Sequence, residues 1–445
     1  MGRDRYVDFL RAWSIVLVVL GHWLVTGLER HADGRITAPE LLATVPWTQW
    51  LTLGFQIMPL FFLAGGYAAG GSWARAREAG GTIGGWVGQR ALRLLLPTAA
   101  YCGLVLSALG VCGALTVDRA TLAMVGWAMA MQLWFLPVYL LLSALTPVLY
   151  GLHQRWGLRV PLGMGLVGGG VGMLGVLSDS SFVGAVGPVT SLLVWGVTYQ
   201  LGFCWRDGLS GRGRVVPVGM AVGGGVAFAG LVGPGPFPVS LIMVTGQDLS
   251  NTDPPSPAML AWAVAQVGVA LLAAPGVRRL LRGAGVWAAV RAVGSGSMTL
   301  YLWHMLPVLV AAAFYLTGLA PQPGYGSVGW WILRVPWLVV LGAVLAGVVW
   351  GLRPLERGLA SLNVRLRPDP GARWAWRLWA GLGLSVWALT YFAGHGFAYG
   401  GRFPVWPAAG LGAGTVLVAL NRGADRKGGN GDGGAQTRRK LEEAA

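Results

Sequence analysis

Long apolar runs, separated by short polar connections, occupy most of this 445-residue chain. A helix needs about 20 mostly apolar residues to cross a bilayer, and runs of that length predict about 12 membrane-spanning helices. Their approximate bounds are 9–28, 48–72, 90–115, 121–150, 158–178, 182–205, 213–234, 257–276, 295–319, 327–352, 374–395 and 403–421. Charged residues make up only 11% of the chain, against about 25% in soluble proteins. The sequence therefore predicts an all-α, polytopic membrane helical bundle and argues against an ordinary soluble enzyme or a disordered chain.

The basic side chains follow the predicted topology. The chain carries 33 Lys and Arg against 17 Asp and Glu. When Arg3 and Arg5 are placed in the cytoplasm, most other basic residues also fall in predicted inner connections, and the outer connections keep only Arg30, Arg35, Arg119 and Arg402. Because cytoplasmic loops of membrane proteins carry an excess of Lys and Arg, this pattern predicts a plasma-membrane protein with both termini in the cytoplasm. It also accounts for the charge without nucleic-acid binding.

Two ionisable residues interrupt the first apolar run. Arg11 and His22 are 11 positions apart, about three helical turns, so they share one helix face about 16 Å apart. Ionisable side chains inside a span are costly and usually functional. A His can act as a base or nucleophile, and an Arg can hold a phosphate. The structural alternative is that Arg11 reaches the lipid headgroups and His22 bonds a backbone carbonyl.

A second His lies in a later span. His304 follows Tyr301 by three residues, so a helix would place both side chains on one face. This pair can line a reaction cavity, or His304 can be a core residue beside an aromatic stripe.

Further polar residues interrupt other runs. Arg90 and Arg93 share a face at the cytoplasmic start of a span, where they can clamp the phosphates of a donor or serve as positive-inside anchors. Gln132 and Trp134 can line a polar cavity or only make interhelical contacts.

Arg334 lies inside a span near its outer end and needs a partner. Asp248, Asp253 and a substrate are the candidates. The three cysteines are scattered through apolar runs without metal-ligand spacing, so neither a metal site nor a disulfide framework is expected.

Several segments together resemble the acyltransferase-3 family of integral membrane acyltransferases. The segments that carry the resemblance, over about residues 5–355, are Tyr6–His22, Pro59–Tyr67, Arg90–Pro97, Leu133–Leu136, Asn251–Ser256 and Ser297–His304. Ala64 and Gly65 stand where the second segment usually has a Ser, which puts a role for that hydroxyl in doubt.

The resemblance implies transfer of an acyl group, commonly acetyl, from cytoplasmic acyl-CoA to a hydroxyl. In the family, the acceptors are commonly glycans or glycosylated small molecules. No permanently bound cofactor is implied, and acetyl-CoA is a cosubstrate. The partners expected are the lipid bilayer, acyl-CoA and the acceptor. The hypothesis makes His22, Arg11 and His304 catalytic, with Arg90 and Arg93 on the donor phosphates, and His22 acts as base or acyl carrier. The expected cavity-lining residues are Tyr301, Trp134, Gln132 and Arg334.

The predicted organisation has three parts: a ten-helix acyltransferase domain over 1–355, two additional transmembrane helices over 356–421, and a disordered cytoplasmic tail over 422–445. A transporter or flippase for a small polar or anionic substrate is the main alternative, since intramembrane Arg and His also suit a transport path.

Overall fold

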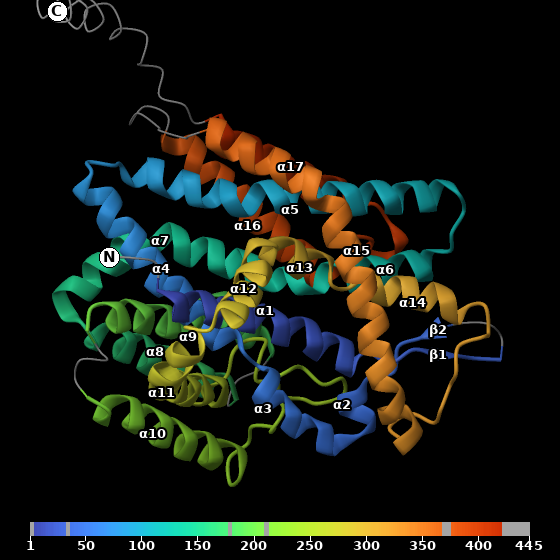
Figure 1. Cartoon of the computed structure of the whole chain (residues 1–445), viewed down its shortest axis with the longest axis horizontal. Coiled ribbons are helices and arrows are strands. Elements are labelled where there is room, and N and C mark those ends of the chain that lie inside the picture. The colour runs from blue at the N-terminus through green and yellow to red at the C-terminus, as the bar shows by residue number, and fades with distance from the viewer. Residues whose placement is uncertain (1–3, 33–35, 177–179, 209–212, 367–374, 421–445) are drawn as a thin grey trace, which may run out of the picture.

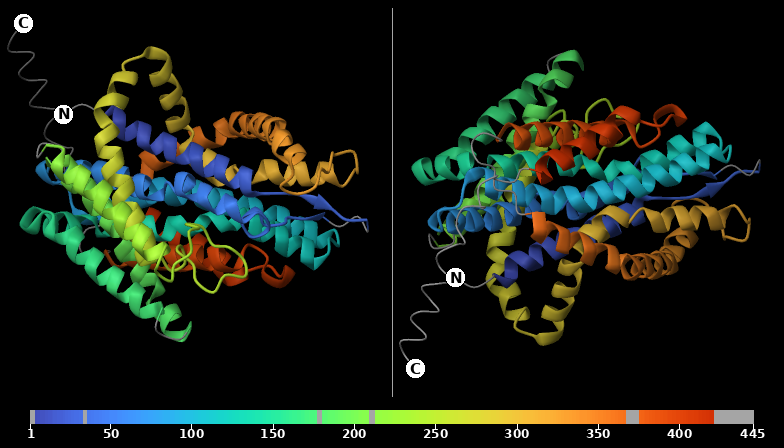
Figure 2. Two further views of the ribbon diagram at one scale, coloured as in Figure 1. Left: turned by 90° about the horizontal axis from the view of Figure 1, so that it is seen from below. Right: turned by 90° about the horizontal axis from the view of Figure 1, so that it is seen from above.

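The computed structural model describes residues 4–32, 36–176, 180–208, 213–366 and 375–420, with the backbone alone for 180–185. Most of the long helices run roughly along the longest axis of the molecule, so many connections gather at its two ends (Figure 1). The turn between α11 and α12 projects from the bundle (Figure 2). The predicted all-α membrane bundle is confirmed in this architecture. The predicted tail lies outside the described residues.

The first half of the chain forms helices and one short strand pair. The elements are α1 (Arg5–Val25), β1 (Glu29–Arg30), β2 (Ile36–Thr37), α2 (Leu41–Thr44), a 3₁₀ helix (Pro46–Leu51), α3 (Thr52–Phe55), α4 (Met58–Glu78), α5 (Ile83–Ala114), α6 (Arg119–Ala130), a 3₁₀ turn (Met131–Trp134), α7 (Phe135–Trp156), α8 (Arg159–Val176) and α9 (Ser180–Arg206). The strands pair antiparallel, with Glu29 opposite Thr37.

The second half is helical. The elements are α10 (Val215–Val232), α11 (Pro257–Leu280), α12 (Ala284–Ser295), α13 (Ser297–Trp303), α14 (Leu306–Tyr315), α15 (Val328–Leu366), α16 (Ala375–His395), a 3₁₀ turn (Tyr399–Gly401) and α17 (Val405–Ala419). Helix α15 passes through position 355, the predicted domain boundary. The division into domains stays a prediction.

Nine helical segments in the described residues are long and apolar enough to cross a membrane. They include α1, α5, α8, α10, α11 and α15, and three segments that each join consecutive helices. The predicted spans at 182–205, 374–395 and 403–421 form α9, α16 and α17, which are not among the nine. Helix α17 has only 15 residues, fewer than the ~17 that a span usually needs. The count of 12 is therefore not confirmed.

The predicted span over 48–72 breaks at Gln56 and Ile57, between α3 and α4, and two further predicted spans are also interrupted. The span predicted over 121–150 changes to a 3₁₀ turn at Met131–Trp134 between α6 and α7. The span predicted over 295–319 breaks between α13 and α14 at His304 and Met305. Pro307 explains this last break, because proline has no N–H for the carbonyl of Trp303 and its ring clashes with that carbonyl.

Close approach of α4 and α9 depends on two glycines. A Cβ on Gly66 would lie 1.9 Å from the carbonyl oxygen of Tyr199, and one on Gly202 would lie 2.3 Å from that of Leu63. Small residues allow this contact between membrane helices. The neighbouring Ala64 is fully buried and Gly65 faces the Tyr139 ring. The sequence departs from the family pattern at positions that are filled by packing.

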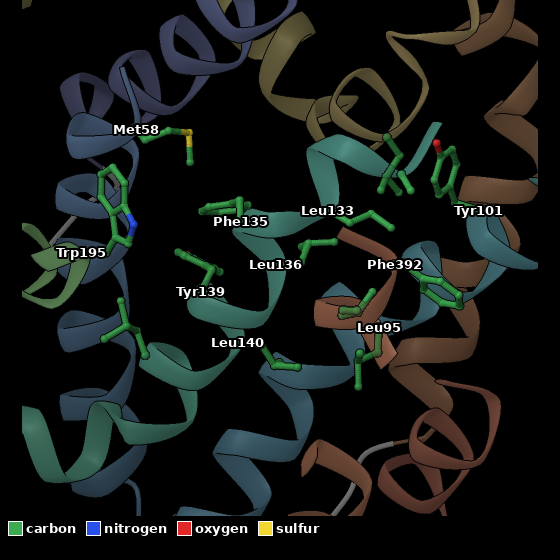
Figure 3. Close-up of a cluster of buried hydrophobic side chains, with 14 of the residues drawn as sticks. Met58, Leu95, Tyr101, Leu133, Phe135, Leu136, Tyr139, Leu140, Trp195 and Phe392 are labelled. Atoms are coloured by element: carbon green, nitrogen blue, oxygen red, sulfur yellow. The ribbon is translucent and has the colours of Figure 1, made fainter. Parts of the chain in front are cut away.

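The apolar core surrounds α7. Met58 of α4, Phe135 and Tyr139 of α7 and Trp195 of α9 gather on one side of that helix (Figure 3). Other labelled side chains fill the space between α5, α7 and α16, namely Leu95, Leu133, Leu136, Leu140 and Phe392. Helices α16 and α17 pack on each other and against α5. The C-terminal helices thus extend the same core.

We expect Gly202→Ala to destabilise the protein by roughly 1–3 kcal/mol, the usual penalty of overpacking. The matched control is Gly223→Ala in α10, where a Cβ meets nothing within 4 Å and where replacing a helical glycine adds up to about 1 kcal/mol of stability. Thermal unfolding of both variants in detergent measures the difference. Equal unfolding temperatures would contradict the account of the α4–α9 contact.

Candidate functional site

A cavity of about 250 Å³ lies between α1, α4, α5, α7 and α13. Three guanidinium groups line it, those of Arg11 on α1 and of Arg90 and Arg93 on α5. In the described part of the chain, no carboxylate lies within ion-pair distance of any of them. Arg90 instead stacks over the ring of Trp86, 4.9 Å from its centroid. This concentration of unpaired positive charge suits an anionic ligand.

Apolar side chains form the other walls of the cavity. Met58, Phe61, Phe135 and Tyr139 line it from α4 and α7. The rings of Phe61 and Phe135 meet edge to face, with centroids 4.9 Å apart. Pockets that combine apolar walls with a few convergent polar groups are typical of ligand sites. The cavity therefore suits a ligand with an anionic end and a less polar arm.

Helix α1 leads from the arginines to His22. It begins after Asp4, whose carboxylate caps the helix by accepting from Tyr6 N at 2.9 Å. Tyr6 then donates to the Ala270 carbonyl of α11 at 2.6 Å, which fixes this end of α1. Arg11 and Val18 both line the cavity, and His22 follows Val18 by four residues, about one turn further along the same face. The geometry predicted for Arg11 and His22 is present in one continuous helix.

His22 and His304 are hydrogen-bonded to each other. His22 Nδ1 and His304 Nε2 are 3.2 Å apart, and the ring centroids are 5.0 Å apart. His22 Nδ1 also lies 2.9 Å from the Val18 carbonyl. His304 Nδ1 lies 2.7 Å from the Tyr301 carbonyl. His304 is fully buried and His22 is half-buried. The two histidines that the sequence singled out thus form one unit. Val18 and Tyr301, whose carbonyls contact the two rings, line the cavity.

Two helix breaks lie next to the histidine pair, at Met131–Trp134 and at His304–Met305. Side chains near each break donate hydrogen bonds to backbone carbonyls near the other. Gln132 Nε2 donates to the Leu302 carbonyl at 3.1 Å and to Tyr101 Oη at 2.9 Å. In return, Tyr301 Oη donates to the Gln132 carbonyl. Trp23 Nε1 donates to the His304 carbonyl at 2.7 Å. Carbonyls released by the breaks therefore have side-chain donors, as the membrane interior requires.

Arg334 lies away from the cavity, against the end of α1. Its Nη1 donates to the Thr26 carbonyl at 2.8 Å. Its guanidinium stacks over Trp330, 3.8 Å from the ring centroid, and lies 5.0 Å from that of Trp337. A cation beside the last carbonyls of a helix is favourable. Among the described residues, neither Asp248 nor Asp253, the predicted candidates, forms an ion pair with it.

The connection between α14 and α15 covers this end of the molecule. Tyr325 packs on Trp330 with centroids 5.0 Å apart. Burial raises the pKa of Tyr325 to about 12, so the hydroxyl stays protonated at neutral pH and donates to the Pro39 carbonyl at 2.7 Å. The end of α1 beyond His22 is thus enclosed by aromatic side chains.

The predicted site residues divide into three groups. Those that line the cavity are Arg11, Arg90, Arg93 and Tyr301. Those at the adjoining helix breaks are His22, His304 and Gln132. Outside both groups, Trp134 packs against Trp195, and Arg334 contacts the C-terminal end of α1.

Sequence reasoning did not single out several residues that line the cavity, among them Ser14, Phe61, Tyr139 and Met298. Ser14 had a usable signal, because it follows Arg11 by three residues and therefore shares its face. The apolar residues had none, because a cavity wall and a packed core use the same side chains.

We expect Gln132→Leu to destabilise the protein by roughly 1–3 kcal/mol, the cost of leaving a buried polar group without a partner. The matched control is Gln154→Leu, near the exposed end of α7, where a substitution changes stability by at most about 0.5 kcal/mol. Thermal unfolding in detergent compares the two variants. The network would be unimportant if both variants unfolded like the unaltered protein.

Comparison with known proteins agrees with this geometry. A family model described as an acyltransferase domain, that of the acyltransferase-3 family, matches residues 4–353. The nodulation protein NolL of Sinorhizobium fredii is 33% identical over 104 residues, which are 23% of this chain and 25% of that protein. The chain therefore aligns with only about a quarter of that relative. No solved structure gives a significant match. The chain belongs to the acyltransferase-3 family.

Proposed function

We propose that the protein is an O-acetyltransferase of the plasma membrane. It takes an acyl group, acetyl, from acyl-CoA that binds from the cytoplasm and transfers it to a hydroxyl of a glycan or glycosylated small molecule at the outer side. Both termini lie in the cytoplasm, in accord with the basic inner connections. The observation that carries the proposal is a cavity lined by three guanidinium groups that have no ion-pair partner among the described residues; its wall on α1 ends at Val18, one turn before His22.

The proposed donor site uses the charge of the cavity. Arg11, Arg90 and Arg93 bind the phosphates of the nucleotide end, where guanidinium groups can form paired hydrogen bonds. The less polar thioester arm extends along Phe61 and Phe135 toward His22. This orientation brings the thioester to the half-buried imidazole of His22 and leaves the phosphates near the arginines. No permanently bound cofactor is needed, because the thioester is already an activated acyl group.

His22 is the proposed general base. Within the described residues its Nε2 has no hydrogen-bond partner, and both contacts of the ring use Nδ1. Nε2 takes the proton from the acceptor hydroxyl while the oxygen attacks the thioester carbonyl. The carbon–sulfur bond then breaks, and the same proton passes to the departing thiolate. Coenzyme A leaves as a thiol and the acceptor leaves as an ester.

We expect His22→Ala to lower the transfer rate by about 10²- to 10⁴-fold, the usual contribution of a positioned base. Purified protein in proteoliposomes is given labelled acetyl-CoA and a glycan extract, and labelled ester is measured. His31→Ala, at a half-buried His between β1 and β2 that does not line the cavity, is the control and keeps full activity. Full transfer by His22→Ala would remove His22 from the mechanism, and trapping of an acetylated His22 would make it an acyl carrier instead.

We expect Arg90→Met to raise the KM for acetyl-CoA by roughly 10-fold or more, because a hydrogen bond between charged groups contributes about 1.5–3 kcal/mol. A thioester donor that lacks the nucleotide phosphates loses nothing further in this variant. Arg155→Met, at an exposed position near the end of α7, is the control for general loss of positive charge. Equal losses with both donors would show that Arg90 does not bind the phosphates.

Transport is the second candidate, and one observation favours it. Two interrupted helices meet at the site, and broken helices near the middle of the membrane commonly hold transporter substrates. Proteoliposomes separate the two functions. Movement of label across the membrane without formation of an ester would support a transporter, whereas ester formation that depends on His22 supports the acetyltransferase.

A further inference from the structure

The pattern of hydrogen bonds assigns a protonation state to both rings of the histidine pair. A carbonyl oxygen only accepts hydrogen bonds, so each Nδ1 that faces a carbonyl must carry a proton. For His304 this is the Tyr301 carbonyl at 2.7 Å, and for His22 it is the Val18 carbonyl at 2.9 Å. Two neutral rings with protonated Nδ1 atoms leave both Nε2 atoms as acceptors. The one proton on His22 Nδ1 is therefore shared in a three-centre hydrogen bond between the Val18 carbonyl at 2.9 Å and His304 Nε2 at 3.2 Å.

We propose that His304 is the positioning residue of a histidine dyad: it accepts the Nδ1–H of His22, keeps the basic Nε2 of His22 turned toward the acceptor, and takes a share of the positive charge when that Nε2 is protonated. This inference rests on the proposed function and deepens it. It gives His304 a role without contact to either substrate, which agrees with its complete burial.

The surrounding contacts fix His304 as an acceptor. Its own Nδ1–H is occupied by the Tyr301 carbonyl, so its ring cannot rotate without losing that bond. Its backbone carbonyl accepts from Trp23 Nε1 of α1 at 2.7 Å, one residue beyond His22. The break between α13 and α14 releases the backbone groups that make these contacts. Both rings are thus locked between α1 and the broken helix.

The dyad resembles the serine-protease triad in its chemistry, with an imidazole in place of the carboxylate that orients the catalytic ring. When His22 Nε2 takes the hydroxyl proton of the acceptor, the imidazolium charge spreads through the shared Nδ1 hydrogen bond toward His304. The proton on Nε2 then goes to the sulfur of the departing coenzyme A. No proton is gained or lost overall, and His304 ends the cycle in its starting state.

The direct test is the tautomer of the two rings, which does not depend on activity. The whole chain contains five His, so a protein labelled with ¹⁵N in its histidine rings gives a simple spectrum in lipid bilayers. The sample is kept near pH 8.5, about two units above the ordinary imidazole pKa. Single His22→Gln and His304→Gln variants assign the signals. We expect protonated Nδ1 and unprotonated Nε2 in both rings, and a ¹⁵N–¹⁵N correlation between His22 Nδ1 and His304 Nε2.

A protonated Nε2 on His304, or the absence of that correlation, would overturn the dyad even if His22 proved essential for transfer. Conversely, full activity of His22→Ala would remove the proposed function and leave the spectroscopic result intact. The two failures are therefore distinguishable.

Kinetics of two His304 variants test the role of the acceptor atom. Glutamine can place a carbonyl oxygen near the position of Nε2, whereas leucine has no acceptor. We expect His304→Leu to lower kcat by roughly 10- to 100-fold at unchanged KM for acetyl-CoA, the range supplied by a hydrogen bond to a charged group, and His304→Gln to recover a large part of that loss. His395→Leu and His395→Gln are the matched controls, at a helical His that also faces a carbonyl of its own helix, that of Tyr391 at 3.2 Å. Equal rates for His304→Leu and His304→Gln would reduce His304 to a packing residue. If His304→Leu does not fold, the spectrum of the unaltered protein still decides.

Discussion

Backbone groups inside a membrane must find their hydrogen-bond partners within the protein, since lipid offers none. This constraint governs the centre of the structure, where two helices are broken. The Leu302 carbonyl accepts from Gln132, the Tyr301 carbonyl accepts from His304, and the His304 carbonyl accepts from Trp23. The same bonds that satisfy the breaks also fix the rings that the proposed chemistry uses. Stability and function therefore depend on one network.

Charge is arranged around that network by the same principle. Within the described part of the chain, Arg11, Arg90 and Arg93 have no carboxylate partner around the cavity, which is costly unless an anion binds there. Arg334, by contrast, donates from Nη1 to the end of α1 and stacks on two Trp rings. The three arginines of the cavity are typical of an anion-binding site. Arg334 has the character of a clamp on the helix that carries His22.

The class of fold could be predicted from the sequence, because long apolar runs with few charges indicate a bundle of membrane-spanning helices. The sequence was also sufficient for the Arg11 and His22 face, because an uninterrupted helix fixes that spacing. It did not reveal the 3₁₀ turn at Met131–Trp134, since one Gln within an apolar run does not specify a 3₁₀ turn. Nor did it reveal the partner of Arg334, because a carbonyl at the end of a helix has no residue signature. The pairing of His22 with His304 needed three dimensions, since 282 positions separate them.

The central claim is that His22 serves transfer of an acetyl group to a hydroxyl outside the membrane. Mass spectrometry of cell-surface glycans and extractable metabolites tests it most directly, in cells that express either the unaltered chain or His22→Ala at equal amounts. The account predicts acetyl esters on an acceptor in the first cells and their loss in the second. Identical acetylation in both would contradict it.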